Sequence, residues 1–296
     1  MDVREAIIRT ISYFDLFDRP LSRAEIVAWL YGGATPAGEV ETAVTALLGE
    51  KLIKEEKGLI YFFDREGLSG IYAARKLFSA RKWARARRWA RIFAAFPGVE
   101  LVGIGNTLAY DNARDGSDID FFIVTAPGMI WRTRFFCAAL AAIFDLRPKE
   151  NDERDKLCLS FFVTDEALAM SQLSIGADDI YMHYWTRLMR PLYGNAGVDE
   201  LFCAANPGAQ PREKIRSTGM LRALFAPLAL LPGRFMADWQ QRHFPPVLRA
   251  AEARHDGSVV VSETVLKFHV SDRRREVYER WVKRVDSILH EARQNR

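Results

Sequence analysis

Hydrophobic residues in the first part of the chain recur at the spacing of helices and then of strands. Residues 2–17 carry an apolar stripe with helical spacing, and Arg23–Tyr31, which begins at a capping box, predicts a second helix. A third helix is predicted for Pro36–Glu50. Lys51–Lys54 and Leu59–Phe63 follow as a hairpin around a Lys-Gly turn. The pattern therefore predicts three short helices and a hairpin.

The middle of the chain alternates between helical and buried-strand patterns. A long helix is predicted around residues 75–91, where alanines and long side chains give high helix propensity. Two short apolar segments, Glu100–Ile104 and Phe121–Val124, predict strands on either side of a polar turn. Met129–Phe144 reads as a buried helix, and Leu157–Val163 reads as a buried strand.

The last third of the chain is predicted to be mostly helical. Asp178–Leu192, Met220–Leu231 and Phe235–His243 have helical character, and the final helix is predicted for Arg273–Arg293. One strand is expected, within Val259–Val265.

Composition narrows the classes of protein that fit. Of 296 residues, 49% are hydrophobic and 27% charged, which is ordinary for a globular protein, and the net charge of +4 is compatible with phosphate-bearing partners. Three widely spaced cysteines without a C-x-x-C pair favour neither a disulfide framework nor a zinc site. The N-terminus lacks an apolar signal region, and the apolar run Met220–Leu231 is too short to span a bilayer. We therefore expect a cytoplasmic protein without a membrane partner.

The polar turn between the two central strands carries the candidate chemistry. Asp118 and Asp120 lie two residues apart at the start of the second strand, so their side chains are expected to project from the same face. Two neighbouring carboxylates repel each other unless a cation lies between them. Oxygen ligands of this kind suit Mg²⁺ (or Mn²⁺) together with substrate phosphates. Upstream, Gly105-Asn106 precedes a predicted helix start, where exposed N–H groups favour an anion.

These residues resemble a known family. Gly105-Asn106, then Ser117-Asp118-Ile119-Asp120 and an apolar strand, are similar to the nucleotidyltransferase superfamily of DNA polymerase beta, whose pattern is Gly-Ser, about ten residues, and Asp-x-Asp. Asn106 replaces the serine of that pattern. The resemblance covers Val99 to Val163. It implies that Asp118 and Asp120 hold the metal, that Gly105 and Asn106 contact the nucleotide phosphates, and that Ser117 orients the acidic pair.

One feature of the family is missing. Its active members usually place a third carboxylate on the strand that corresponds to Leu157–Val163, and this strand contains no acid. Ser160 is the expected third-carboxylate position, with Cys158 as the alternative on the same face, and Asp155 is too far away along an extended strand. His269 could act at the site, although a lone histidine near a strand end more often has a structural role.

The helix over residues 75–91 has eight basic residues and no acidic one. Arg81, Arg85 and Arg88, with Lys82, could bind a triphosphate or a nucleic-acid backbone. The alternative, weighed equally, is a solvated helix whose arginine stems cover the core.

The N-terminal helices and hairpin resemble a winged helix-turn-helix. Its third helix has Glu39, Glu41 and Glu50 and no basic residue, so it is poorly suited to approach phosphates. Packing or protein contact is favoured over DNA binding.

The fold class predicted from these features is α+β, with a mixed-sheet nucleotidyltransferase core. Three domains are expected: winged-helix-like residues 1–66, a nucleotidyltransferase domain at 67–170 that includes the basic helix, and a mostly helical region at 171–296. The leading hypothesis is Mg²⁺-dependent transfer of a nucleoside monophosphate from an NTP to a hydroxyl on a nucleic acid (tRNA or DNA), a protein or a small molecule. The alternative is a catalytically degenerate regulatory or interaction protein that binds a nucleotide or a nucleic acid.

Overall fold

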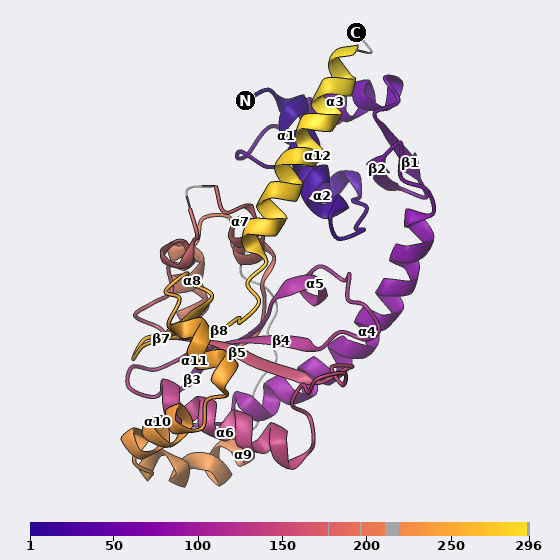
Figure 1. The fold of residues 1–296 in the computed structure, drawn as a ribbon. Helices are drawn as coiled ribbons and strands as arrows, with labels where there is room; N and C mark the ends of the chain where they lie inside the picture. The colour runs from indigo at the N-terminus through magenta and orange to yellow at the C-terminus, as the bar shows by residue number, and fades with distance from the viewer. Residues whose placement is uncertain (177, 196, 211–218, 295–296) are drawn as a thin grey trace. The chain divides into compact units, whose positions relative to one another are not determined.

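A computed structural model describes residues 1–176, 178–195, 197–210 and 219–294 (Figure 1). The chain forms two compact units, one made of Met1–Leu77 with Arg273–Arg296 and the other of Phe78–Asp272. The boundary falls inside helix α4 (Leu68–Phe93). The chain is thus not divided into the three consecutive segments expected from its sequence, because its last helix belongs with its first ones.

The first unit contains the three predicted helices and the hairpin. Its elements are α1 (Val3–Asp15), α2 (Arg23–Ala28), α3 (Ala37–Gly49), β1 (Ile53–Glu56), β2 (Leu59–Phe62) and the last helix, α12 (Arg274–Gln294). The capping box before α2 is confirmed, since Ser22 and Glu25 bond each other's backbone N–H groups. Leu21 also forms an isolated antiparallel bridge with Ile60 of β2.

Helix α12 completes the core of this first unit. Its buried residues recur every three or four positions, as an amphipathic helix requires: Val277, Trp281, Val285, Ile288 and Ala292. The helix packs along α1, where the indole N–H of Trp281 donates to the carbonyl of Arg9 at 2.9 Å. The predicted helix at Arg273–Arg293 is confirmed, but it packs on α1 rather than within a C-terminal domain.

The second unit is built on a mixed six-stranded sheet. The strand order is β6 (Arg190–Gly194), β3 (Val99–Ile104), β4 (Ile119–Thr125), β5 (Leu157–Thr164), β8 (Val265–Phe268) and β7 (Val259–Val261). Only β4 and β5 are parallel, and helix α6 (Ile130–Ile143) connects them. The α+β class with a mixed sheet is therefore confirmed.

Helices cover both faces of this sheet (Figure 1). Alternate residues of β4 enter two separate cores, because successive side chains of a strand point to opposite faces. Phe121 and Ile123 pack with α4 and α6, whereas Phe122 and Val124 pack with α7 (Ile180–Leu188) and α8 (Val198–Ala205). Asp120 is two residues before Phe122, so its side chain points to the same face of the sheet, the face that α7 covers.

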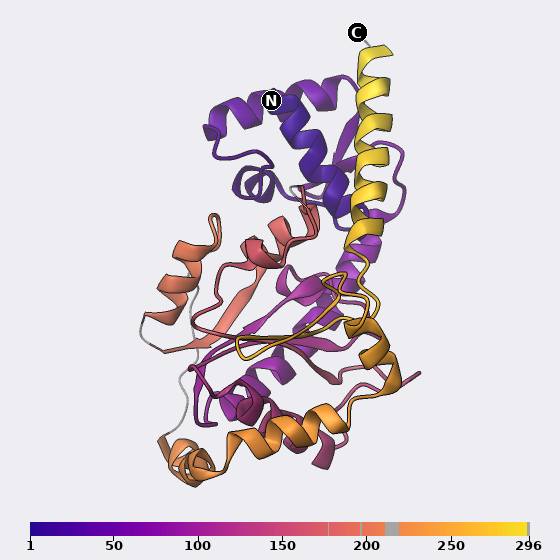
Figure 2. The ribbon, with the colours of Figure 1, turned by 60° about the vertical axis from the view of Figure 1, so that its left-hand side comes forward.

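Shorter elements complete the second unit. They are α5 (Asn106–Ala109), η1 (Met170–Leu173), α9 (Gly219–Phe225), η2 (Ala226–Leu230), α10 (Gly233–Arg242) and α11 (Pro246–Glu252). Helix α10 runs beside α6 (Figure 2). In the described residues no single helix is long and apolar enough to cross a membrane; the pair Gly219–Leu230 and Gly233–Arg242 reaches that length together but bends by 83°.

Two predictions for the last third of the chain need correction. The helix predicted for Asp178–Leu192 ends at Leu188, and strand β6 begins two residues later. Pro191 cannot continue a helix because it lacks the backbone N–H. The single strand expected within Val259–Val265 is a hairpin of two short strands, β7 and β8.

Candidate functional site

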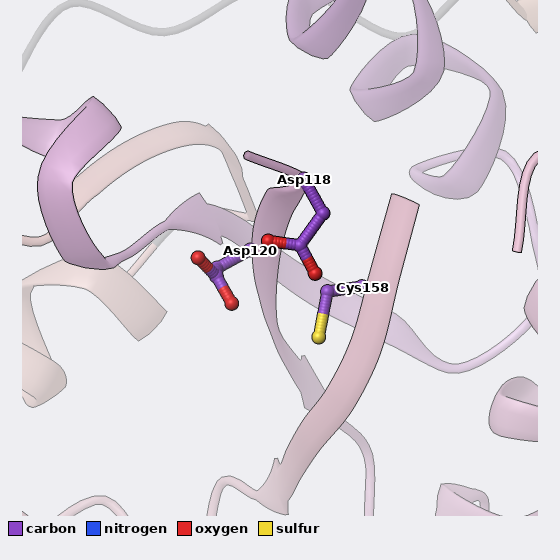
Figure 3. Close-up of side chains that lie close together, drawn as sticks. All are labelled: Asp118, Asp120 and Cys158. Atoms are coloured by element: carbon purple, nitrogen blue, oxygen red, sulfur yellow. The ribbon is translucent and has the colours of Figure 1, made fainter. Parts of the chain in front are cut away.

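The predicted acidic pair lies at adjacent ends of the two parallel strands. Asp118 precedes β4 by one residue, Asp120 is the second residue of β4, and Cys158 is the register partner of Asp120 on β5. One ligand atom from each of the three side chains lies within 4.8 Å of the others (Figure 3). The two carboxylates therefore share a site, and the residue that joins them is a cysteine.

The acidity of this pair is set by burial and by neighbouring negative charges. Burial, together with the negative charges of Asp120 and Glu153, raises the pKa of Asp118 to about 8. Burial also raises the pKa of Asp120, although hydrogen bonds from Asn106 and Cys158 act in the opposite direction. Among the described residues, neither carboxylate forms an ion pair with a lysine, arginine or histidine. An uncompensated buried pair of this kind is costly without an external cation.

The Gly105-Asn106 turn lies against Asp120. The N–H of Gly105 donates to the carbonyl of Asp120 at 3.1 Å. Asn106 adopts a left-handed conformation, with φ of +53°, which asparagine tolerates better than most residues. Its side chain donates to the Asp120 carboxylate and accepts a hydrogen bond of 2.7 Å from the Tyr181 hydroxyl. Asn106 therefore positions Asp120 directly.

Close packing against Trp185 explains why position 105 is a glycine. A Cβ at this position would lie 2.7 Å from the indole nitrogen of Trp185, so a larger residue would displace that ring. The helix that follows, α5, has only four residues. It adds little dipole to the phosphate-binding role expected for the turn.

A bulge in β5 changes which side chains face the site. Asp120 is opposite Cys158 and Phe122 is opposite Phe161, so two steps along β4 match three along β5. Phe161 consequently packs on Phe122, with ring centroids 5.1 Å apart, while Phe162 enters the opposite core. Leu159 and Phe161, which strict alternation would place on one face of the sheet, therefore lie in opposite cores, because bulges break the alternation of a strand.

The bulge gathers three polar side chains, none of them a carboxylate, where the family resemblance implies an acid. The Ser160 hydroxyl lies 3.1 Å from the Cys158 thiol and 3.2 Å from Nε2 of His269. Ser160 and His269 also line a small pocket with Gly105, Asn106 and Asp120. Cys158 is a β5 residue whose side chain hydrogen-bonds to both carboxylates. His269, for which the sequence favoured a structural role over one at the site, contacts Ser160 there.

Ser117 does not orient the acidic pair as expected. Its hydroxyl donates to the carbonyl of Arg114 at 3.0 Å. The loop before Asp118 is instead held by Lys82, which is fully buried on α4. Its ammonium donates to the carbonyls of Ser117 at 2.6 Å and Asp115 at 3.1 Å and pairs with Asp155 at 2.7 Å. Lys82 is therefore a structural cation.

The other basic residues of α4 divide into two groups. Arg81 pairs with Asp115 at 2.7 Å and with Asp155 at 3.0 Å, so its partners are carboxylates of the chain. Arg88 is exposed, and Arg85 has a buried Nε without a hydrogen-bond partner. No described hydrogen bond or ion pair joins Arg85 or Arg88 to the acidic pair. The apolar side of α4 packs on the opposite face of the sheet.

Glu153 is a residue near the site that no sequence pattern indicated. This exposed residue lies on the loop before β5, and its charge raises the pKa of both Asp118 and Asp120. Asp155, which the sequence placed too far from Ser160, points toward Lys82 and Arg81. Burial alone would raise the pKa of Asp155, but the hydrogen bonds from those two cations lower it. Of these two acids, Glu153 is the one whose negative charge acts on Asp118 and Asp120.

Comparisons with protein-family models, curated proteins and solved structures found no match. The resemblance to nucleotidyltransferases therefore rests on the residues of the site.

Two of the three side chains in the cluster, those of Asp118 and Asp120, are suited to bind a hard cation. Carboxylate oxygens are preferred ligands of Mg²⁺ and Mn²⁺, whereas a thiol is a soft ligand. Burial and the two neighbouring carboxylates raise the pKa of the Cys158 thiol well above its usual value. Cys158 thus remains protonated and acts as a hydrogen-bonding neighbour, while Asp118 and Asp120 would hold the ion.

Proposed function

We propose that the protein is a Mg²⁺- or Mn²⁺-dependent nucleotidyltransferase that moves a nucleoside monophosphate from an NTP to a hydroxyl acceptor. The observation that carries this proposal is the half-buried Asp118–Asp120 pair, which has no cation from the described chain beside it. A divalent ion there would neutralise both the carboxylates and the triphosphate. Such catalysis consists mostly of positioning and charge stabilisation, so few side chains are required.

The residues around the pair would orient the reactants. Asn106 holds Asp120 in place through its side-chain amide, and Lys82 anchors the loop that carries Asp118. The Gly105-Asn106 turn lies beside the carboxylates, where its backbone would face the phosphates. Arg85 and Arg88 stay candidates for contact with a longer polyanion, because their guanidinium groups form no described ion pair.

The reaction would form one bond and break another at the α-phosphorus. The acceptor oxygen bonds to that phosphorus, the bond to the bridging oxygen of the β-phosphate breaks, and pyrophosphate leaves with the electron pair. The hydroxyl proton passes through Ser160 to Nε2 of His269, which lies 3.2 Å from the serine oxygen. His269 would thereby replace the third carboxylate that is absent from β5.

A second candidate is a regulatory or interaction protein that binds a nucleotide without transferring it. It is favoured by the absence of an acidic residue on β5. In the winged-helix-like first unit, Glu41 of α3 and Glu55 of the hairpin are paired with Arg23, and Glu50, which follows α3, is paired with Arg4. Carboxylates on α3 would repel DNA, so this unit is better suited to contact a protein.

The two candidates are separated by incubating the full chain with each α-labelled NTP and either metal. Acceptors would include tRNA, DNA, proteins and small hydroxyl compounds, and the readouts are pyrophosphate release and label transfer. Transfer that is lost in Asp120→Asn supports the enzyme. Metal-dependent NTP binding in calorimetry, without transfer to any acceptor, supports the binding protein. If no NTP binds in the presence of metal, both candidates are wrong.

A further inference from the structure

A cavity of about 510 Å³ opens beside the acidic site in the second unit. Its walls come from α6, from α10 and the start of α11, and from the first half of β5. Phe268 at the end of β8 and Val270 after it also line the cavity. Small-molecule sites commonly have volumes of about 300 to 1,000 Å³. The cavity is therefore large enough for a small organic molecule.

The strand pairing explains why the cavity reaches the site. β8 pairs with β5 only at Phe161, Phe162 and Val163. The first half of β5 lines the cavity instead, including Cys158 and Ser160. Both residues also belong to the cluster around Asp120, so a molecule in the cavity would have one end beside the carboxylates.

Most of the cavity wall is apolar. Helix α6 contributes three alanines, Ala138, Ala139 and Ala142, whose small side chains leave space in front of the helix. Aromatic rings, including those of Phe244 and Phe268, form the opposite side. A wall of this kind suits an apolar body and would exclude a triphosphate.

Two arginines interrupt this apolar wall. Arg134 and Arg147 both line it, and no aspartate or glutamate does. The Arg134 guanidinium lies 4.4 Å from the ring centroid of Phe268 and donates to the side-chain oxygen of Gln240. Its Nε is buried without a hydrogen-bond partner. Within the described ranges neither arginine forms an ion pair.

An arginine that packs on aromatic rings and has no described carboxylate partner favours the binding of an anionic ligand. Burial and the neighbouring positive charge of Arg147 lower the pKa of Arg134 to about 10, which means that its charged form is destabilised here relative to water. A carboxylate or phosphate could bind it in a bidentate manner. Gln240 cannot supply this charge, and its amide N–H is already bonded to the carbonyl of Trp131 at 2.8 Å.

We propose that this cavity binds the hydroxyl acceptor and that the acceptor is a small amphiphilic anion. Its apolar body would lie against α6 and the aromatic rings, its carboxylate or phosphate would bind Arg134 and Arg147, and its hydroxyl would lie at Cys158 and Ser160. This assignment of an acceptor class rests on the proposed nucleotidyl transfer. That hydroxyl oxygen bonds to the α-phosphorus of the NTP, pyrophosphate leaves, and the proton moves through Ser160 to His269.

Binding is tested first without nucleotide, so that it does not depend on catalysis. Calorimetry with the full chain would compare ω-hydroxydecanoate, ω-hydroxydecyl phosphate and uncharged decanediol. The anions should bind about tenfold more tightly than the diol, the effect of one charge-assisted hydrogen-bonded pair. The stronger of the two anions identifies a carboxylate or a phosphate acceptor. Equal affinity for all three compounds would overturn the proposal.

Substitutions then locate the bound anion. Arg147→Gln, at an exposed position, and Arg134→Gln should each weaken anion binding about tenfold and leave diol binding unchanged. Ala139→Leu should weaken all three probes by filling the cavity. Arg91→Gln, an exposed arginine of α4 outside the cavity, is the matched control. Unchanged anion affinity in both Arg134→Gln and Arg147→Gln would refute the site.

The failure of this inference can be distinguished from failure of the proposed function. If the probes bind through Arg134 and Arg147 but release no pyrophosphate from any NTP, the cavity is an anion site and the nucleotidyl transfer to it is refuted. If transfer to other acceptors occurs and is insensitive to Arg147→Gln and Ala139→Leu, the enzyme stands and the cavity is not its acceptor site. Asp120→Asn should retain probe binding in either case.

Discussion

Two groups of acidic side chains lie at the same end of β4 and differ in their counter-charges. Asp155 donates its backbone N–H to the carbonyl of Ser117 and is bound by Lys82 and Arg81. Asp118, the next residue after Ser117, forms its cluster with Asp120 and Cys158 and has no described cation beside it. The pKa of Asp155 is therefore lowered, whereas that of Asp118 is raised to about 8.

The difference separates structural carboxylates from those available to a ligand. The first unit follows the pattern of Asp155, because Asp18 and Asp64 are paired there with arginines such as Arg65 and Arg284. These pairs join segments of the chain that are far apart in sequence. Asp118 and Asp120 join nothing of this kind, so an external cation is the partner that explains their burial.

The largest expected effect is on nucleotidyl transfer. Asp120→Asn should lower the transfer rate by about a thousandfold, because it removes one of two ligands of the ion that stabilises the developing charge. The metal-free fold should be as stable as before or more so, since a neutral amide relieves the repulsion with Asp118. Steady-state pyrophosphate release and thermal unfolding measure the two effects.

Asp155→Asn is the matched control for that substitution. It makes the same chemical change at a carboxylate of the loop before β5, which Lys82 and Arg81 bind. We expect it to lower stability and to leave metal-dependent NTP binding in place. If Asp155→Asn abolished NTP binding while Asp120→Asn did not, the two roles would have to be exchanged.

The next effect is on stability. Lys82→Met should lower the free energy of unfolding by about 3 kcal/mol, because it leaves the carboxylate of Asp155 and two backbone carbonyls without their buried donor. Denaturant unfolding measures this loss. Arg88→Met, an exposed position six residues along the same helix, should change stability little. Equal effects of the two substitutions would show that Lys82 does not anchor the loop.

A third effect is on the pH dependence of stability. The Asp118 pKa of about 8 lies above its value of 3.8 in an unfolded chain, so the folded state binds the proton more tightly. Metal-free protein should therefore lose stability as the pH rises from about 4 to about 8. Asp155 has the opposite sign: its lowered pKa adds stability above 3.8, and that stability is lost as the pH falls through its folded-state pKa.

Metal should reverse the loss between these pH values. At a concentration one hundred times its dissociation constant, Mg²⁺ or Mn²⁺ should add about 2.7 kcal/mol at pH 8. The gain should be smaller at pH 5, where Asp118 is protonated and must lose its proton to bind the ion. Melting curves at both pH values, with and without metal, provide the measurement. A metal-induced shift that persists in Asp118→Asn would place the ion elsewhere.

Local patterns in the sequence predicted most elements and the acidic pair. These features depend on near neighbours along the chain: the helical stripes of α1 and α12, the capping box of α2, and the two-residue spacing that puts Asp118 and Asp120 on one face. Long-range packing could not be predicted in this way. The spacing of apolar residues in α12 does not indicate that its apolar side packs on α1. Strand β6 was not predicted, because the segment that contains it continues directly from helix α7.

The same distinction holds within the site. Asp118, Asp120, Gly105 and Asn106 were found from sequence because they are adjacent in the chain and in space. Lys82 looked like a phosphate-binding residue, since the carboxylate that pairs with it comes from a loop 73 residues later. The bulge in β5 has no glycine to indicate it, so the side on which Phe161 lies could not be predicted.

The smallest expected effect comes from changing the third member of the cluster. Cys158→Asp places a carboxylate opposite Asp120, at the position expected as the alternative to Ser160 for a third acid. With metal present, transfer should rise about tenfold, because an additional ligand or proton acceptor would then be positioned beside the ion. Without metal, a third buried carboxylate should lower the melting temperature, and metal should restore it. Ser160→Asp is the matched control: the bulge moves position 160 out of register with Asp120, so it should give the smaller gain. A larger gain from Ser160→Asp than from Cys158→Asp would show that the metal lies on the side of His269 rather than between the carboxylates and the thiol.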